Sequence, residues 1–287
     1  MQGIAAPRAI GPQLAGRSVR PAPISWASPV SEQPKSDALD DTYEVERSKW
    51  DAFADREFAS AGQPGYLPTF AEFVSETPSW AKATEFVGDL RGARVLEYGC
   101  GVGYLAAILA REGALVSAFD LSERSVAVTR HRLQANELSG EISVAAGEDL
   151  PYASDSFDIV IGTSVLHHLE VSRAAPELYR VLRPGGRGTF LEPMGMNPLL
   201  NFARDHLYYR QKTDRGADHP LTYQDLEAWG RGASRYTFRE GQLVSMVERF
   251  FGWDTHFHRL HRVDAAVLAR VRPLRRYARQ VAIYIEK

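Results

Sequence analysis

Short apolar runs and amphipathic helical patterns alternate through the middle of the chain, from residue 93 to residue 192. The apolar runs are rich in Val, Ile, Leu and Phe and are bounded by glycine, proline or charged residues, which is typical of buried strands. Strands that alternate with helices predict an α/β fold with a mostly parallel sheet and helices on both of its faces. After a first strand around Val95 and Leu96, the predicted strands cover residues 114–120, 142–145, 157–162 and 188–192, and the predicted helices cover residues 104–110, 122–136 and 173–182.

Glycine occupies alternate positions in the turn after the first strand, at Gly99, Gly101 and Gly103. A side chain in such a turn would hold the backbone away from a ligand, and the next helix begins there with free N–H donors. A dinucleotide fingerprint also needs glycine at position 104, where this chain has Tyr104. The turn therefore favours a nucleotide-like ligand, with an ordinary tight turn as the alternative until its neighbours are considered.

Two acidic residues accompany this turn. Glu97 stands two residues before Gly99, and Asp120 ends the second predicted strand, at the sheet edge where ligands of open α/β sheets bind. A carboxylate at the position of Asp120 can accept hydrogen bonds from both ribose hydroxyls of a nucleoside. Ser122 is available to cap the next helix, so Asp120 is not needed for that role. Together the two acids favour a bound nucleoside.

The run Glu-Tyr-Gly-Cys-Gly-Val-Gly, with Asp120 after it and Gly-Glu-Asp-Leu-Pro-Tyr after the third strand, resembles the motifs of class I S-adenosyl-L-methionine (SAM) methyltransferases. The resemblance implies a Rossmann-like, seven-stranded, mostly parallel sheet with an antiparallel last strand, an N-terminal helical lid and an insertion after strand five. It implies SAM as the cofactor, with its methionine half over the glycine turn and its adenine at Asp149 and the N–H of the next residue. The cofactor-binding residues predicted in this way are Tyr43, Trp50, Glu97, Gly99, Gly101, Gly103, Asp120, Leu121, Glu148, Asp149, Leu150 and Ser164.

A general base is needed when the methyl acceptor must lose a proton. In the family that the chain resembles, the loop after strand four closes on the methyl group, which implies His167 as a candidate. Glu192 ends the fifth predicted strand at the same sheet edge and is the second candidate. The alternative for each is a structural role, because a histidine in such a loop often only packs or bonds to the backbone. No metal site is predicted.

The rest of the chain divides by composition. Residues 1–40 are rich in proline and have no acidic residue before Glu32, which predicts a flexible or partner-bound arm. Trp26 within it could anchor the arm on a neighbouring subunit of a homo-oligomer. The further predicted segments are a helical lid at residues 41–90, the SAM-binding core at 91–193, the roof of a substrate pocket at 194–240, and the completion of the sheet at 241–287, with an antiparallel strand pair at 252–260 and 280–286.

Charge and cysteine content narrow the partners that we expect. The net charge of the 287 residues is −2, which does not call for a polyanionic partner. An arginine cluster at residues 270–279 lacks the aromatic residues of an RNA-binding platform, so we expect no nucleic-acid partner. Cys100 is the only cysteine and no apolar run has the length of a membrane span, so we expect a cytoplasmic protein without membrane contact.

The resemblance implies an enzyme that transfers a methyl group. The aromatic residues of the predicted lid and roof favour a small, lipophilic or aromatic metabolite as its substrate. With His-Pro-Leu-Thr at residues 219–222, the chain resembles microbial methyltransferases that act on small or lipophilic molecules, and its whole organisation is similar to that of actinobacterial natural-product C-methyltransferases of the teleocidin type. That similarity implies methylation of a prenyl alkene carbon, followed by rearrangement or cyclisation of a carbocation. The alternative is methylation of an oxygen or a nitrogen. A non-catalytic SAM-binding protein and a nicotinamide-dependent oxidoreductase are the alternatives from other functional classes.

Overall fold

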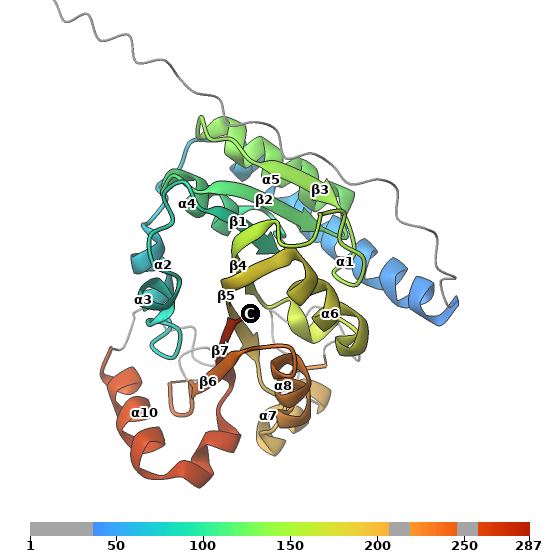
Figure 1. Cartoon of the computed structure of the whole chain (residues 1–287). Helices are drawn as coiled ribbons and strands as arrows, with labels where there is room; N and C mark the ends of the chain where they lie inside the picture. The colour runs from blue at the N-terminus through green and yellow to red at the C-terminus, as the bar shows by residue number, and fades with distance from the viewer. Residues whose placement is uncertain (1–36, 207–218, 246–257) are drawn as a thin grey trace, which may run out of the picture.

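One seven-stranded sheet forms the centre of the computed structural model, which describes residues 37–206, 219–245 and 258–287 (Figure 1). Its strands are β1 (Arg94–Tyr98), β2 (Leu115–Asp120), β3 (Glu141–Val144), β4 (Phe157–Thr163), β5 (Leu182–Pro193), β6 (Arg235–Gly241) and β7 (Gln280–Glu286). They lie in the order β3-β2-β1-β4-β5-β7-β6. Strands β1 to β5 are parallel, and β7 is antiparallel to both of its neighbours. The predicted Rossmann-like fold class is confirmed.

The strand order reverses at the centre of the sheet, where β1 and β4 pair side by side. β2 and β3 extend the sheet on one side of β1, and β5, β7 and β6 extend it on the other side of β4. Ligands of open parallel sheets bind beyond the carboxyl ends of the strands at such a reversal. The fold therefore directs attention to the ends of β1 and β4.

Both faces of the sheet are buried, which explains why its strands appear in the sequence as nearly continuous apolar runs. Val95 packs on one face with α4 (Tyr104–Arg111) and α5 (Glu123–Ala135). Leu96 packs on the opposite face with α6 (Val171–Val181) and α8 (Tyr223–Gly230). Because side chains alternate along a strand, one short strand supplies both cores.

Three helices precede the first strand: α1 (Asp37–Ala61), α2 (Phe70–Ser75) and α3 (Ala83–Val87). They occupy the segment predicted as a lid, residues 41–90, except that α1 begins four residues before it. The second half of α1 packs along α5, where Ala54 and Ala61 contact Val128. Asp51 adds a polar contact, because its Oδ1 accepts the hydroxyl of Ser122 at 2.5 Å. This half of α1 is therefore fixed to the sheet layer.

The C-terminal third differs from the prediction. Residues 280–286 form β7 as expected, but their partner is β6, at residues 235–241, and not residues 252–260. The last residues of the predicted partner begin α10 (His258–Arg270), and residues 252–257 lie outside the described residues. The segment predicted as a substrate roof contains α7 (Pro198–His206), α8 and most of β6. The short helix η2 (Arg272–Tyr277) connects α10 to β7.

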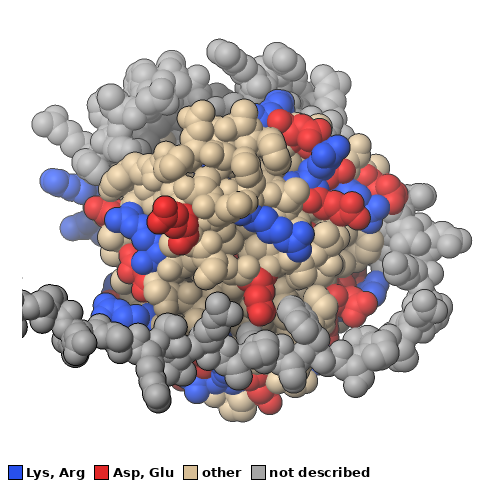
Figure 2. Space-filling model, turned by 90° about the horizontal axis from the view of Figure 1, so that it is seen from above, with Lys and Arg blue, Asp and Glu red and all other residues tan. Residues whose placement is uncertain are grey.

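The described surface in Figure 2 mixes Lys and Arg with Asp and Glu, without one sign of charge dominating that view. None of the described helices combines the length and the apolar character needed to cross a bilayer. The expected absence of nucleic-acid partners stays a prediction.

Candidate functional site

A cavity of about 330 Å³ opens at the reversal point of the sheet. Its lining comes from the ends of β1, β2 and β4, from the turns that follow β1, β3 and β4, and from α1, α2 and α4. This volume lies at the lower end of the range of about 300–1,000 Å³ that is usual for small-molecule sites. The cavity therefore lies where the fold leads us to expect a ligand.

Glu97 contributes a buried carboxylate to the cavity. The residue is 3% exposed, and its Oε2 has no hydrogen-bond partner among the described residues. Burial first, and the nearby Asp120 second, raise the pKa of Glu97 well above its ordinary value. A buried carboxylate oxygen without a partner is unfavourable, so a cationic ligand group is the natural complement of this position.

Asp120 and the glycine turn are joined directly. Oδ2 of Asp120 accepts the N–H of Gly101 at 2.8 Å, and Oδ1 accepts the N–H of Ser122 at 2.9 Å. Each oxygen retains acceptor capacity for a ligand hydroxyl. Burial raises the pKa of Asp120, and these hydrogen bonds oppose that shift. Gly101 has φ +49 and open space where a Cβ would stand, so its backbone is accessible from the cavity.

A second pair of polar groups meets where α1 approaches the turn after β3. Oε1 of Glu148 accepts the N–H of Glu170 at 2.9 Å, whereas its Oε2 and the hydroxyl of Tyr43 make no hydrogen bond within the described residues. Burial first, and then the charge of Glu148, raise the pKa of Tyr43. Both side chains line the cavity and have capacity to bind a ligand.

Four more predicted cofactor residues, Gly99, Leu121, Ser164 and Trp50, also line the cavity. Gly99 has φ +71, and a Cβ there would stand 2.5 Å from the side chain of Val165. Only glycine allows the turns after β1 and β4 to approach so closely.

Three predicted cofactor residues lie outside the cavity lining. Gly103 begins α4 with φ +75 and packs against α5, where a Cβ would meet Thr129 at 2.6 Å. Asp149 is exposed to solvent. Leu150 is buried, and its N–H donates to Oε2 of Glu177 at 2.9 Å, so this N–H is not available to adenine. All three residues shape the turns around the cavity. Their roles in cofactor binding stay predictions, except for the N–H of Leu150, which Glu177 already occupies.

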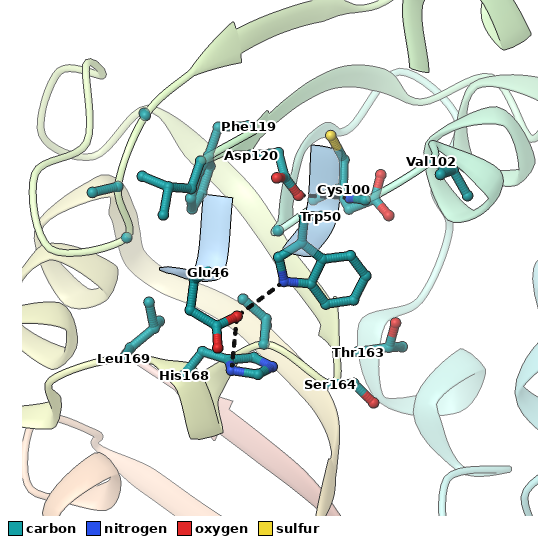
Figure 3. A pocket seen from close by; sticks show the side chains of 18 of the residues that line it. Glu46, Trp50, Cys100, Val102, Phe119, Asp120, Thr163, Ser164, His168 and Leu169 are labelled. Carbon is teal, nitrogen blue, oxygen red and sulfur yellow. Dashed lines mark hydrogen bonds and ion pairs between the residues drawn. The ribbon is translucent and has the colours of Figure 1, made fainter. Parts of the chain in front are cut away.

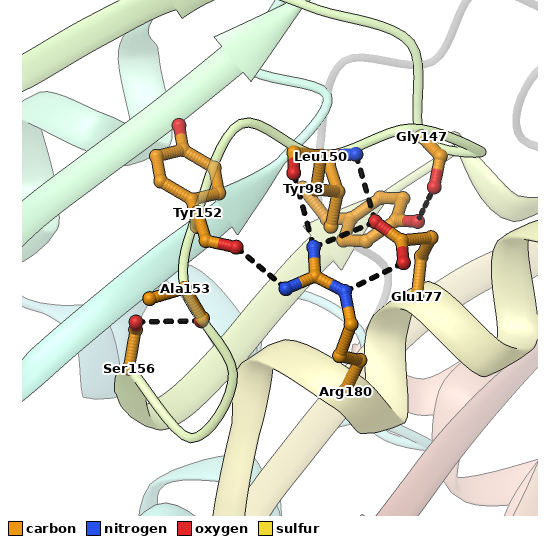
Figure 4. Close-up of polar contacts among 8 residues, drawn as sticks. All are labelled: Tyr98, Gly147, Leu150, Tyr152, Ala153, Ser156, Glu177 and Arg180. Atoms are coloured by element: carbon orange, nitrogen blue, oxygen red, sulfur yellow. Dashed lines mark hydrogen bonds and ion pairs between the residues drawn. The ribbon is translucent and has the colours of Figure 1, made fainter. Parts of the chain in front are cut away.

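Figure 4 shows how α6 holds the turn after β3. Arg180 donates to the carbonyl oxygens of Leu150 at 3.0 Å and Tyr152 at 2.6 Å, and pairs with Glu177 at 2.6 Å. Glu177 in turn accepts the N–H of Leu150. One Arg-Glu pair therefore satisfies both the N–H and the carbonyl of Leu150, two residues after Glu148.

The two predicted bases also lie outside the cavity lining. Nδ1 of His167 is 2.8 Å from Oε2 of Glu192, while Oε1 of Glu192 accepts the N–H groups of Val165 at 2.9 Å and Leu166 at 3.0 Å. Glu192 is 1% exposed. The pair holds the turn after β4 from behind, because its polar atoms are directed at that turn, and the catalytic roles of His167 and Glu192 stay predictions.

The histidine that lines the cavity is the next one, His168, which our sequence reasoning missed. Its Nδ1 lies 3.5 Å from Oε2 of Glu46, and the same oxygen accepts the indole N–H of Trp50 at 3.2 Å (Figure 3). Tyr43, Glu46 and Trp50 are three and four residues apart, which places them on one face of α1. That spacing was a usable signal for Glu46.

Metal binding finds no support in the described part of the chain, where no cluster of three or more His, Cys, Asp or Glu side chains could hold an ion. Residues 194–202 and 219–240 of the predicted roof do not line this cavity. The substrate roof predicted at residues 194–240 stays a prediction, and residues 207–218 of it lie outside the described residues.

Comparison with known proteins connects this geometry to a family. Residues 96–190 match the family described as "Methyltransferase domain". Methyltransferase GfsG of Streptomyces halstedii is 42% identical over 100 residues, 33% of this chain and 36% of that protein. A ubiquinone biosynthesis O-methyltransferase of Rhizobium leguminosarum bv. trifolii is 30% identical over 156 residues, 50% of this chain and 62% of that protein. The chain thus covers less than two thirds of the length of these relatives.

Among solved structures, the [4+2]-cyclase SpnF superposes with a TM-score of 0.53 at 20% sequence identity, covering 86% of this chain and 96% of the other. Identity at this level shows a shared fold alone, and one fold supports many activities. The match to the family covers the segment from β1 to β5, which supplies the glycine turn, Asp120 and the turns after β3 and β4. Residues 96–190 are therefore similar to a methyltransferase domain, and they form the central strands of a Rossmann-like seven-stranded sheet.

Proposed function

We propose that the protein is a SAM-dependent methyltransferase acting on a small, largely apolar or aromatic metabolite. The observation that carries this proposal is the buried, unpartnered carboxylate oxygen of Glu97 in the same cavity as Asp120 and Gly101. SAM presents an ammonium group and a ribose diol at opposite sides of its sulfonium, and these groups match a buried acid and a strand-end carboxylate. An ordinary packed turn gives no reason for Glu97 to lack a partner.

The residues present fit the cofactor. Glu97 would receive the ammonium group, Asp120 the ribose hydroxyls, and Leu121 would pack against the adenine. Tyr43 and Glu148 would supply polar contacts from α1 and from the turn after β3. All five side chains line one cavity.

The bound sulfonium supplies an activated methyl group with a good leaving group. The protein then gains rate mainly through alignment of the acceptor, which can contribute about 7–11 kcal/mol in favourable cases. The turn after β4 and the face of α1 border the space in which an acceptor would be held. Their rigidity comes from the pair His167–Glu192 behind the turn and from the packing of α1 on α5.

Aromatic rings define the acceptor class that we propose. Trp50, Phe53, Phe73 and Tyr104 line the cavity, and such faces suit apolar or aromatic molecules. Methylation of oxygen or nitrogen is favoured by the presence of His168 at the cavity, since such acceptors must lose a proton. Methylation of a prenyl alkene, as in natural-product biosynthesis, is the second candidate, because aromatic faces also stabilise a carbocation. Position of the methyl group in a labelled product distinguishes the two.

Calorimetry with S-adenosylhomocysteine, SAM and NAD tests the cofactor, and Asp120→Asn is the informative variant. Loss of charge-assisted hydrogen bonds is expected to weaken S-adenosylhomocysteine binding by about 10- to 100-fold. Asp89→Asn, at an exposed aspartate, is the matched control and should bind as the wild type does. Preference of the wild type for NAD, or unchanged binding by Asp120→Asn, would refute the proposal. Turnover with a metabolite library distinguishes an enzyme from a non-catalytic SAM-binding protein.

A homo-oligomer formed through residues 1–40, the absence of nucleic-acid and membrane partners, and a cytoplasmic location stay predictions. Residues 1–36 lie outside the described residues.

A further inference from the structure

We propose that Glu46 of α1 orients His168, so that this histidine accepts the proton of the methyl acceptor; the inference rests on the proposed function. Both side chains line the cavity, but they come from different layers of the fold, α1 and the turn after β4. A base assembled in this way depends on α1 lying over the cavity. Glu46 is accordingly a positioning residue, which acts through His168.

One carboxylate oxygen makes the relevant contacts. Oε2 of Glu46 lies 3.5 Å from Nδ1 of His168 and accepts the N–H of Trp50 at 3.2 Å, as Figure 3 shows. Glu46 is 7% exposed, so water competes little for this oxygen. A separation of 3.5 Å is long for a hydrogen bond, and distances of this kind at catalytic sites shorten when a substrate binds.

A carboxylate at Nδ1 determines the protonation pattern of a neutral imidazole. It places the proton on Nδ1 and leaves the lone pair on Nε2. In Figure 3 the second ring nitrogen of His168 points away from Glu46. In the transfer step, the N–H or O–H proton of the acceptor goes to this lone pair, the freed electron pair of the acceptor bonds to the methyl carbon, and the electrons of the breaking carbon–sulfur bond stay on sulfur.

The other charged and titratable groups around His168 are engaged differently. Nζ of Lys49 lies 4.0 Å from Oε1 of Glu46, and the ring centroids of His167 and His168 are 3.9 Å apart. Glu192 is held by His167 and by backbone N–H groups. Farther along the cavity, the polar groups from α1 and the turn after β3 are Tyr43 and Glu148.

The anchor of α1 explains why Glu46 can hold its position. Asp51, five residues after Glu46, accepts the hydroxyl of Ser122, and the N–H of Ser122 donates to Asp120. Helix α1 is therefore tied to the strand end that would bind the ribose. The proposed base and the proposed cofactor site share one structural support.

The deciding experiment is ring ¹⁵N NMR of the full chain, with the His168 signals assigned from a His168→Gln spectrum. In the wild type near pH 7.5, His168 is expected to carry its proton on Nδ1. Glu46→Gln should remove that preference, Glu46→Asp should restore it in part, and Glu44→Gln should leave it intact. Glu44 is a matched control because it is exposed on the same helix, where it pairs with Arg47 at 2.7 Å.

A wild-type His168 that carries its proton on Nε2, or a tautomer unaffected by Glu46→Gln, would overturn the inference. The first outcome needs no Glu46 variant, so the test stands even if Glu46→Gln does not fold. Binding of S-adenosylhomocysteine to the wild type, measured in parallel, separates failure of the proposed function from failure of the inference. With an acceptor in hand, Glu46→Gln should lower kcat about 10- to 100-fold, the usual effect of losing a group that orients a functional histidine, with KM for SAM unchanged.

Discussion

The protein has two adjacent histidines, each facing a glutamate, and the two pairs differ in almost every structural respect. Nδ1 of His167 lies 2.8 Å from Oε2 of Glu192, and Glu192 also accepts two backbone N–H groups. Nδ1 of His168 lies 3.5 Å from Oε2 of Glu46, and both side chains line the cavity. In this pair the glutamate comes from α1 rather than from the sheet. The first pair directs its polar atoms at the protein itself, whereas the second lines the cavity, where it can contact a ligand.

This difference teaches that residue type and proximity do not identify a catalytic pair. Glu192 directs both of its oxygens at residues of the turn after β4, which places them away from a substrate in the cavity. The pair outside the cavity is better regarded as the support of the pair inside it, because it fixes the turn that carries His168. The distinction predicts opposite effects of mutation on stability and on ligand binding.

The largest effect should come from Glu192→Ala. Removing this carboxylate leaves two buried N–H groups and His167 without their acceptor, which should lower the free energy of unfolding by about 3–5 kcal/mol. Urea denaturation measures the loss. Glu192→Gln keeps one acceptor oxygen, so its free energy of unfolding should fall much less. Glu46→Ala removes no backbone partner, so it should also lose less stability than Glu192→Ala. Equal losses for Glu192→Ala and Glu46→Ala would remove the distinction between the pairs.

Glu97 extends the comparison to an acid with one oxygen that has no protein partner at all. Because burial raises its pKa in the folded protein above the unfolded value of about 4.3, ionisation is disfavoured by folding. Stability should therefore fall as pH rises from about 4.3 through the folded pKa. Glu97→Gln removes this dependence and should be more stable than the wild type at about pH 8, with a smaller difference at about pH 5.

The same variant should bind S-adenosylhomocysteine about 10- to 100-fold more weakly, because a neutral amide cannot replace a carboxylate beside an ammonium group. Urea denaturation at the two pH values and calorimetry provide the measurements. Glu85→Gln, an exposed site on α3, serves as control. A variant that is less stable at high pH and binds normally would show that Glu97 has a purely structural role.

The sequence predicted the strands of the core well, because each is a buried apolar run that ends in a turn signal. It failed at β6, where exposed and half-buried residues alternate from Arg235 to Glu240. An edge strand of this kind is defined by its pairing with β7, which begins about forty residues later in the chain, and carries little local signal. The partly polar segment was therefore assigned to the substrate roof.

For the site, residues at strand ends were predictable because the order of strands and turns fixes where Glu97 and Asp120 lie. Which of the adjacent histidines, His167 or His168, lines the cavity was not predictable from the sequence. Both belong to the short 3₁₀ helix η1 (Leu166–His168), in which successive side chains diverge by roughly 120°. Each histidine faces a glutamate that is far away in sequence, Glu192 for His167 and Glu46 for His168. Leu150 shows the same limit, since its N–H is taken by Glu177.

The smallest predicted effect concerns Arg180, which supports the cavity from outside as Glu192 does. Arg180→Met removes the donors to the carbonyl groups of Leu150 and Tyr152 but keeps much of the aliphatic volume. The turn that carries Glu148 should then be less well fixed, and S-adenosylhomocysteine binding should weaken by about 3- to 10-fold, equivalent to roughly 1 kcal/mol, the net value of a typical hydrogen bond. Calorimetry measures this loss.

Arg183→Met is the control for Arg180→Met, because Arg183 pairs with Asp158 at 2.7 Å and has a half-exposed side chain. The control should not change binding. If both variants bind equally well, the turn after β3 holds its shape without α6, and support from outside the cavity is then limited to the turn after β4. If Arg180→Met instead weakens binding as strongly as Asp120→Asn does, the nucleoside depends on the shape of this turn as much as on direct contact. The first outcome would limit support from behind a turn to Glu192. The second would show that ion pairs and acids behind both turns hold the ligand-facing residues in place.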